Sequence, residues 1–301
     1  YGTAAVRSVP SRRGALPPVT PGPDLAVYGY LAYWDDDLVT VPWDDLSHLA
    51  VFSAGASSDG SLTDTDRWDI AREAVAIAEP YGVRVHLCIT NFSPSSLAAL
   101  LGSEASRSRL IEALVSFEAS TGAHGVNVDF EGLPAEVRDE MVTFTRDLDA
   151  AVGDVVLAVP SVDWSDAWDY AALTRHADLF LMGYGYHYGG STTAGPVDPM
   201  YAGEGTVWEG VQSYSLSRSL EDTLANGADP ERLMLGLPLY GMEWPTDDGD
   251  AVPAPATGAG SSVVFSRAWA DEAAYGRSWE PTSHTPYTSV DGQQRWYGDE
   301  E

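Results

Sequence analysis

The run HGVNVDFE occupies residues 124–131 of the chain. In a β-strand, alternate side chains lie on opposite faces. The polar residues Asn127, Asp129 and Glu131 would therefore share one face, and the apolar residues between them would share the other. An apolar face that packs on helices, together with a polar face directed inward, is typical of a strand in a parallel α/β barrel, where the active site lies at the carboxyl ends of the strands.

Short apolar runs rich in β-branched and aromatic residues recur along the chain, and longer amphipathic stretches separate most of them. Together with residues 125–131, we expect strands at residues 27–33, 48–53, 83–90, 155–160, 179–187 and 233–240. We expect helices at residues 66–79, 104–121, 134–151 and 211–226. Strand–helix alternation of this kind predicts an α/β fold with a parallel sheet, and seven repeats favour a (β/α)8 TIM barrel over a doubly wound sheet.

The two ends of the chain depart from this pattern. Residues 1–24 hold three Arg and a Pro/Gly-rich run, which is typical of a tail or linker. Residues 25–301 form the expected catalytic barrel. After the seventh strand, residues 263–275 and 279–297 predict a small α+β insertion, and we expect the eighth strand beyond the end of this chain, which would leave the barrel incomplete at its carboxyl end.

The composition limits the partners. Of 301 residues, 45 are acidic and 16 are basic, all 16 being Arg, which gives a formal net charge of −29. A field of this sign repels nucleic acid and anionic membranes, so a neutral polysaccharide is the easier partner. Adaptation to salt and compositional drift explain the acidity about equally well. No apolar stretch reaches the ~20 residues of a membrane helix, so we expect no membrane insertion.

Motifs for metals and cofactors are absent from the sequence. The single cysteine, Cys88, excludes an intramolecular disulfide and a CxxC site, and its apolar surroundings predict a buried packing residue. There is no HExxH, Walker A or GxGxxG motif, and the acidic clusters lack EF-hand spacing. We therefore expect neither a cofactor nor a metal site.

The two carboxylates Asp129 and Glu131 are the strongest chemical signal. Two neighbouring carboxylates directed into a barrel are costly to ionise together, so the pKa of at least one should rise. Raising that pKa is how a carboxylic acid keeps its proton near neutral pH. The alternative is a salt bridge at the barrel mouth, but the sequence offers no Lys or Arg nearby.

Residues 125–131 also resemble the DGxDxDxE signature of glycoside hydrolase family 18, which contains chitinases and related N-acetylglucosaminidases. Other segments agree with the family in order: Gly29-Tyr30 with Trp34, Ser47-His48 with Phe52, Met182 with Tyr184, and Leu235–Gly241. The resemblance covers about residues 25–301. The run Ile89-Thr90-Asn91-Phe92, in place of the usual SxGG, looks most like the subgroup related to spore-cortex peptidoglycan hydrolases.

The resemblance implies a catalytic role for three residues. Glu131 would be the general acid, Asp129 would orient the N-acetyl group of the substrate, and Tyr184 would donate its hydroxyl to the acetamido oxygen. That oxygen would attack the anomeric carbon, so no protein nucleophile is needed. An aromatic residue such as Tyr184 could equally belong to the core.

Further residues would bind the sugar. Tyr30 and Met182 would line its subsite, and Asn127 would lie beside Asp129 in place of a second aspartate. Gly185 replaces the family Asp that helps to hold the N-acetyl group, and Tyr186 and His187 could compensate, although a lone His is more often structural. Four tryptophans are placed to stack on sugars or to pack in the core: Trp34, Trp164, Trp208 and Trp244.

Two functions remain open at this stage. The first is a retaining hydrolase that cuts β-1,4 linkages next to N-acetylglucosamine in chitin-like or peptidoglycan chains. The second is a non-catalytic carbohydrate-binding relative, which Gly185 favours and the retention of Glu131 opposes. By the resemblance we expect a monomer that is secreted or associated with the cell envelope.

Overall fold

The computed structural model describes residues 26–34, 36–247 and 251–299. Within these residues the chain forms two compact units. The barrel unit comprises the described residues up to Leu181 together with Thr223–Met234, and the smaller unit comprises Met182–Asp222 together with the described residues from Leu235 onward. The predicted tail, residues 1–24, lies outside the described residues.

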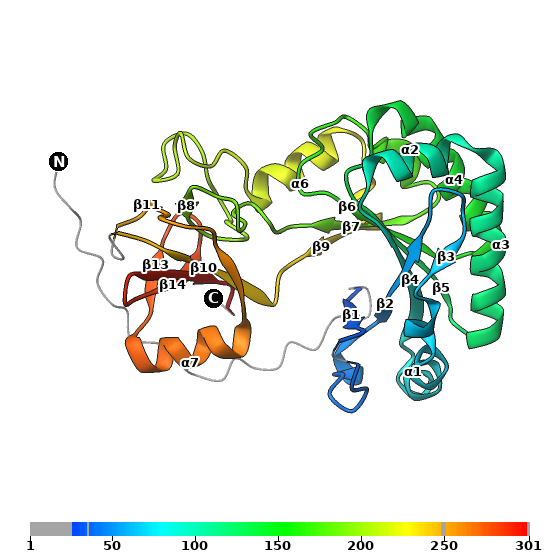
Figure 1. Cartoon of the computed structure of the whole chain (residues 1–301), viewed down its shortest axis with the longest axis horizontal. Coiled ribbons are helices and arrows are strands. Elements are labelled where there is room, and N and C mark those ends of the chain that lie inside the picture. Colours follow the sequence, from blue (N-terminus) through cyan, green and yellow to red (C-terminus); the bar gives the residue numbers. More distant parts are fainter. Residues whose placement is uncertain (1–25, 35, 248–250, 300–301) are drawn as a thin grey trace. The chain divides into compact units, whose positions relative to one another are not determined.

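The seven predicted barrel strands are present, in the sheet order β1-β2-β4-β5-β6-β7-β9. The pairs from β1 to β7 are parallel, and Figure 1 shows the barrel unit's strands curled into a half-barrel. This confirms the α/β class. The strands are β1 (Tyr28–Ala32), β2 (His48–Ala56), β4 (Arg84–Asn91), β5 (Gly125–Phe130), β6 (Val155–Val159), β7 (Asp178–Met182) and β9 (Leu233–Gly236), and the short β3 (Leu62–Thr63) pairs antiparallel with β2.

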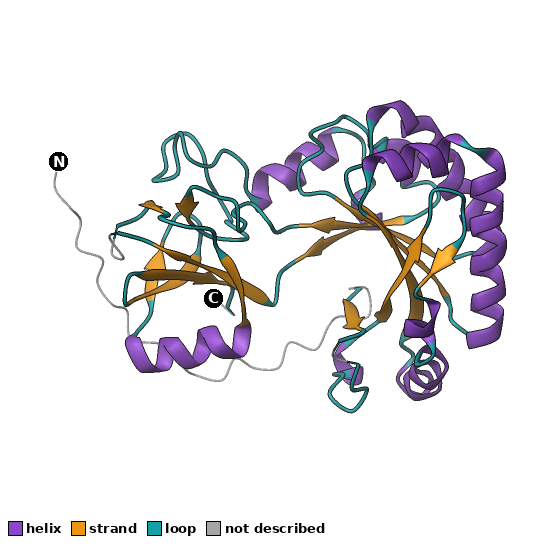
Figure 2. Ribbon diagram, in the orientation of Figure 1, coloured by secondary structure: helices purple, strands orange, loops and turns teal. Residues whose placement is uncertain are grey.

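Helices flank the outer side of the curled sheet (Figure 2). The longest, α3 (Glu104–Thr121), begins where the Ser103 hydroxyl accepts the N–H of Ser106 and ends at Gly122 in the left-handed conformation. The serine cap is a strong local signal for the start of a helix, and the glycine is a strong signal for its end, so the sequence predicts the bounds of α3 correctly. The other α-helices in this part of the chain are α1 (Ala71–Ala78), α2 (Pro94–Gly102), α4 (Arg138–Val152), α5 (Tyr170–Leu173) and α6 (Leu216–Ala225), with 3-10 turns at Trp43–Asp45, Thr65–Trp68, Glu79–Tyr81, Ala135–Val137 and Pro230–Arg232.

Strand β5 has the predicted division of faces. Phe130 is fully buried and stacks on Phe144 of α4, with ring centroids 6.0 Å apart, so the apolar row packs on the helices. Asn127 lies on the other face, where its amide contacts the neighbouring strand β6. Cys88 of β4 is buried, as its apolar context predicts.

The smaller unit holds the predicted α+β insertion. Its antiparallel sheet has the order β12-β10-β15-β14-β13 and packs with α7 (Phe265–Tyr275). Three tryptophans, Trp208, Trp244 and Trp296, are fully buried in its core. The strands are β10 (Tyr240–Pro245), β12 (Ser261–Val264), β13 (Ser278–Glu280), β14 (Thr285–Val290) and β15 (Gln293–Tyr297), and β8 (Thr193–Ala194) pairs with β11 (Ala254–Pro255).

Two predicted strands are too long. The strand expected at residues 179–187 ends at Met182, and Gly185 has φ +83°, a left-handed conformation that an extended strand could not continue through. The strand expected at residues 233–240 ends at Gly236, and Tyr240 begins β10 in the antiparallel sheet. Apolar pattern alone predicts a strand without showing which sheet the strand joins.

The core contact of Phe130 leads to a stability prediction. Phe130→Ala removes a fully buried ring and leaves a cavity between β5 and α4, so the free energy of unfolding should fall by about 3–5 kcal/mol. Urea denaturation followed by circular dichroism measures this loss. Val39→Ala, at a side chain that is 91% exposed, is the control and should leave the midpoint unchanged. An equal midpoint in both variants would contradict the assignment of Phe130 to the helix-facing core.

Candidate active site at the carboxyl end of β5

Asp129 and Glu131 lie at the carboxyl end of β5. Asp129 sits within the strand, opposite Thr90 of β4 on one side and Ala158 of β6 on the other, and is only 7% exposed. Glu131 follows directly after the last residue of the strand and is exposed. One carboxylate is thus held inside the sheet, and the other opens to solvent.

Burial changes the proton affinity of Asp129. Loss of hydration, with a smaller contribution from the charge of Glu131, raises the pKa of Asp129 to about 7. Its Oδ1 has no hydrogen-bond partner among the described residues. Near neutral pH this carboxyl group can therefore either hold a proton or release it.

Glu131 is held by its backbone. Its N–H donates to the carbonyl of Asn91 at 3.0 Å, and the Asn91 side chain donates to the Ala56 carbonyl and to Ser96 Oγ, each at 2.8 Å. Partial desolvation raises the pKa of the Glu131 carboxyl above its ordinary value, which favours the protonated form that a general acid needs.

Sequence reasoning did not assign this role to Asn91. The only signal was that Asn91 belongs to the run Ile89-Thr90-Asn91-Phe92, where the resemblance expects SxGG. The next residue, Phe92, is exposed beside this end of β4. The departure from the family pattern therefore replaces two small residues by a bracing amide and an exposed ring.

Aromatic rings gather along β1 and directly after it. Tyr30 packs edge-on against Phe52 and Phe180, with ring centroids 6.3 and 5.4 Å away. Trp34, 68% exposed, packs edge-on against Phe52 and Tyr33. Trp164, in the loop after β6, is 77% exposed. Flat rings held edge-on by their neighbours keep a face open on which a sugar can stack.

Asn127 lies too deep in the sheet to contact a substrate at this edge. Its side chain is fully buried inside the sheet, and its amide points to the Val156 carbonyl at 3.4 Å. Contrary to the expectation that it binds substrate, Asn127 is part of the interior of the half-barrel, two positions before Asp129 on the same face.

Five of the expected site residues belong to the smaller unit. Met182 is the last residue of β7, and Tyr184, two residues later, donates its backbone N–H to the Met182 carbonyl at 2.8 Å. The Tyr184 ring packs edge-on against Tyr240, with centroids 6.2 Å apart. Both residues are half-buried.

The other three lie in the core of that unit, contrary to the expectation that they contact a sugar. Tyr186 donates its hydroxyl to Ser219 Oγ at 2.8 Å, and His187 Nδ1 lies 2.9 Å from the Pro196 carbonyl. Burial lowers the pKa of His187 to about 4, so the ring is neutral at pH 7. Trp244 is fully buried in β10 and packs edge-on against His187. The three side chains pack in the core of the unit. A residue that packs in this way and a residue that binds a sugar look the same in the local sequence.

The chain resembles known proteins in sequence. The family described as Glycosyl hydrolases family 18 matches residues 26–301. One relative, named "Putative sporulation-specific glycosylase YdhD", from Bacillus subtilis (strain 168), is 26% identical over 175 residues, which cover 55% of this chain and 38% of the relative. The chain spans less than half of the length of each of the curated relatives that it matches.

Many solved structures share the fold, and two of them illustrate the likeness. A glycoside hydrolase family 18 N-acetylglucosaminidase from Paenibacillus barengoltzii superimposes with a TM-score of 0.76 at 17% identity, covering 91% of this chain and 88% of the other. A class V chitinase from Nicotiana tobaccum in complex with NAG4 gives a TM-score of 0.77 at 16% identity, covering 90% and 86%. At these identities the likeness is one of fold.

The raised pKa of Asp129 predicts a pH dependence of stability. The folded state holds this proton up to about pH 7, whereas the unfolded chain releases it near pH 4, so between these values the folded state binds more protons. Stability should therefore fall as pH rises from 4 to 7, by about 4 kcal/mol at most from this residue. Asp129→Asn should flatten this fall in urea denaturation series, with Asp139→Asn as the control. Identical pH slopes for wild type and Asp129→Asn would refute the shift.

Proposed function

Because the chain belongs to glycosyl hydrolases family 18, as its sequence predicts, we propose that it hydrolyses β-1,4 linkages next to N-acetylglucosamine in chitin-like or peptidoglycan chains. The observation that carries this proposal is the pair of carboxyl groups at the end of β5. Asp129 is buried with its pKa raised to about 7, and Glu131 is exposed with its pKa raised. The name of the Bacillus subtilis relative supports a substrate related to sporulation.

In the proposed reaction the exposed Glu131 donates its proton to the glycosidic oxygen as the bond breaks. The acetamido oxygen of the substrate attacks the anomeric carbon as the leaving group departs. The Glu131 carboxylate then takes a proton from water, whose oxygen attacks the anomeric carbon and opens the cyclic intermediate with retention of configuration. Asp129 accepts a hydrogen bond from the acetamido N–H, and its negative charge stabilises the positive charge that develops on the cyclic intermediate. A carboxyl group with a pKa near 7 suits this task, because a small change in its surroundings moves the proton on or off. Tyr184 keeps its proposed role as donor to the acetamido oxygen on the resemblance alone.

The braced position of Glu131 supports its role as the acid. A general acid must lie within hydrogen-bond reach of the leaving oxygen, and small misplacements cost large factors in rate. The backbone bond from Glu131 to Asn91, and the two bonds of the Asn91 side chain, fix the start of the loop after β5. The exposed rings of Trp34 and Trp164 would supply stacking surfaces for sugars on either side of the cut.

A carbohydrate-binding protein without catalysis is the second candidate, and Gly185 is the observation that favours it. Gly185 adopts φ +83°, a backbone conformation that favours glycine. The surrounding space does not require glycine, because no atom lies within 4 Å of an added Cβ. Glycine suits this backbone but offers no side chain in place of the family Asp, so holding of the N-acetyl group would depend more heavily on Asp129.

The structure adds one finding on location. Among the described residues, no helix combines the length and apolar character that crossing a bilayer requires. We propose, from the family and the neutral substrate, that the protein acts outside the cell or at the cell envelope, as a monomer.

Removal of the Glu131 proton tests the proposed acid. Glu131→Gln keeps the shape of the side chain but cannot protonate the leaving oxygen, so release of reducing ends from chitooligosaccharides or peptidoglycan should fall by ~10² or more. Calorimetric binding of the same oligosaccharides should persist. Glu104→Gln, at an exposed carboxylate that starts α3, is the matched control and should keep full activity. A wild-type protein that binds the sugars but releases no reducing ends would favour the second candidate.

A thiazoline mimic of the cyclised intermediate tests substrate assistance. The mimic should bind far more tightly than N-acetylglucosamine, as ligands that resemble a transition state do. Tyr184→Phe should weaken its binding by ~1–2 kcal/mol through the loss of one hydrogen bond. Titration calorimetry on wild type and the variant measures both effects. Failure of the mimic to bind wild type would reject the substrate-assisted route.

A further inference from the structure

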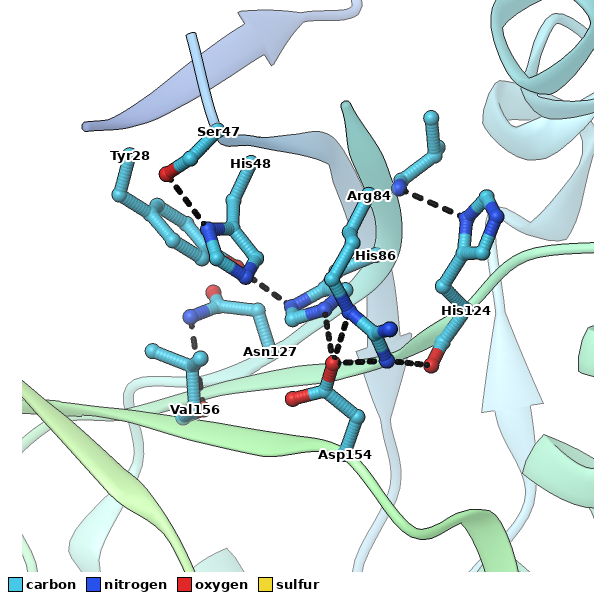
Figure 3. Close-up of polar contacts among 10 residues, drawn as sticks. Tyr28, Ser47, His48, Arg84, His86, His124, Asn127, Asp154 and Val156 are labelled. Atoms are coloured by element: carbon cyan, nitrogen blue, oxygen red, sulfur yellow. Dashed lines mark hydrogen bonds and ion pairs between the residues drawn. The ribbon is translucent and has the colours of Figure 1, made fainter. Parts of the chain in front are cut away.

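Three metal-ligating side chains converge at the amino-terminal end of the parallel sheet, the end opposite the carboxylates. His48 is the first residue of β2, His86 is the third residue of β4, and Asp154 directly precedes β6. One ring nitrogen of each histidine and one carboxylate oxygen of Asp154 all lie within 4.8 Å of one another. Figure 3 shows the three side chains turned toward a common point between their strands.

The hydrogen bonds of His48 leave one of its ring nitrogens available. Ser47 Oγ accepts the N–H of Val27 at 2.8 Å and donates its single proton to the Val27 carbonyl at 3.0 Å. With that proton committed, Ser47 Oγ can only accept from His48 Nδ1, which lies 2.8 Å away. With the proton on Nδ1, the lone pair of His48 lies on Nε2. A histidine that binds a metal commonly does so through one nitrogen while the other donates a hydrogen bond to a neighbouring group, as Nδ1 does here.

His86 is fully buried and engaged on both sides. Its Nδ1 lies 3.0 Å from the Tyr28 hydroxyl, and its Nε2 lies 3.2 Å from Asp154 Oδ2. The separation between Nε2 and Oδ2 already matches the ~3.3 Å between two ligands on one tetrahedral zinc ion, given metal–ligand distances of ~2.0–2.2 Å. The three donor atoms lie within 4.8 Å of one another, so His48 has to approach the other two by up to about 1.5 Å to reach that ligand separation.

An ion-pair network is the competing explanation, and it accounts for only part of the cluster. Arg84 forms a salt bridge to Asp154 Oδ2, so Asp154 is neutralised without a metal. That network gives no role to the Nε2 lone pair of His48, whose ring stands 5.4 Å from the His86 ring. The Arg84 side chain is 46% exposed, so it can turn outward into solvent and leave Oδ2 to a cation.

We propose that His48, His86 and Asp154 form a binding site for a divalent transition metal ion of the zinc class. Two imidazoles and one carboxylate are a donor set that zinc accepts, with water in the fourth position. The ion would join β2, β4 and β6 at the base of the half-barrel. It would stabilise the fold and take no part in the proposed hydrolysis, because its ligands lie at the other end of the strands from Asp129.

Calorimetric titration with zinc chloride tests this site. After dialysis against EDTA and then metal-free buffer, the wild-type chain should bind one equivalent of zinc with a dissociation constant of about 1 μM or lower. His48→Ala should weaken binding by about 100-fold, and so should His48→Gln if the alanine variant folds poorly. His176→Ala is the matched control, because His176 pairs with Asp149 at 3.5 Å without a second histidine, and it should bind zinc as wild type does.

Two further arms separate the site from general attraction of cations to an acidic chain. Zinc should raise the thermal midpoint of wild type but not that of His48→Ala, and magnesium at the same concentration should do neither. Arg84→Gln frees Asp154 Oδ2, so it should tighten zinc binding, whereas in a pure ion-pair network it would only destabilise the protein. Absence of zinc binding by wild type, an equal effect of magnesium, or equal loss in His176→Ala would overturn the proposal.

Discussion

Strand β5 is hydrogen-bonded along both edges, to β4 on one side and β6 on the other, and this pairing decides where the chemistry of the barrel unit can lie. Every residue of the strand is buried, so its side chains open to a substrate most readily toward the carboxyl end, where the pairing stops. The strand ends at Phe130. Asp129 therefore remains in the low-dielectric interior, while Glu131, one residue past the end, reaches solvent. A separation of two residues along the chain is enough to give the two carboxyl groups different environments.

The same pairing defines a second polar site at the other end of the strands. Parallel strands bring their amino ends together as surely as their carboxyl ends. His48, Arg84 and His86 come together because β2 and β4 pair in register from their first residues, and Asp154 enters from the turn before β6. Barrel enzymes keep catalysis at the carboxyl end, so polar residues at the amino end are free to serve stability. A cluster that ties three strands at this end would support the register on which the carboxylates depend.

The sequence predicts the features that depend on neighbouring residues and misses those that depend on contacts between distant segments. The faces of β5, the bounds of α3 and the buried Cys88 depend on strand parity, capping residues and local apolarity, which are read within a few residues. Trp244 follows a predicted strand, and Tyr186 and His187 follow Gly185 within another, so the sequence places all three near the sugar, yet they are buried in the smaller unit. Their fate depends on an antiparallel sheet whose strands come from residues 240–297, and no local pattern contains those pairings. The histidine cluster escaped prediction for the same reason, because its members are separated by 38 and 68 residues in the chain.

The substitution of Asn127 for the usual second aspartate illustrates how burial and charge can replace each other. A second carboxylate at this position would be enclosed beside Tyr28 and β6, and an unpaired buried charge is far more costly than a buried amide. The neutral amide removes the repulsion that such a pair would supply to Asp129. The pKa of Asp129 is nevertheless raised to about 7, and loss of hydration is the larger cause, with Glu131 second. The depth of Asp129 within β5 thus raises its proton affinity without a second aspartate beside it, so the asparagine at position 127 is compatible with the role proposed for Asp129.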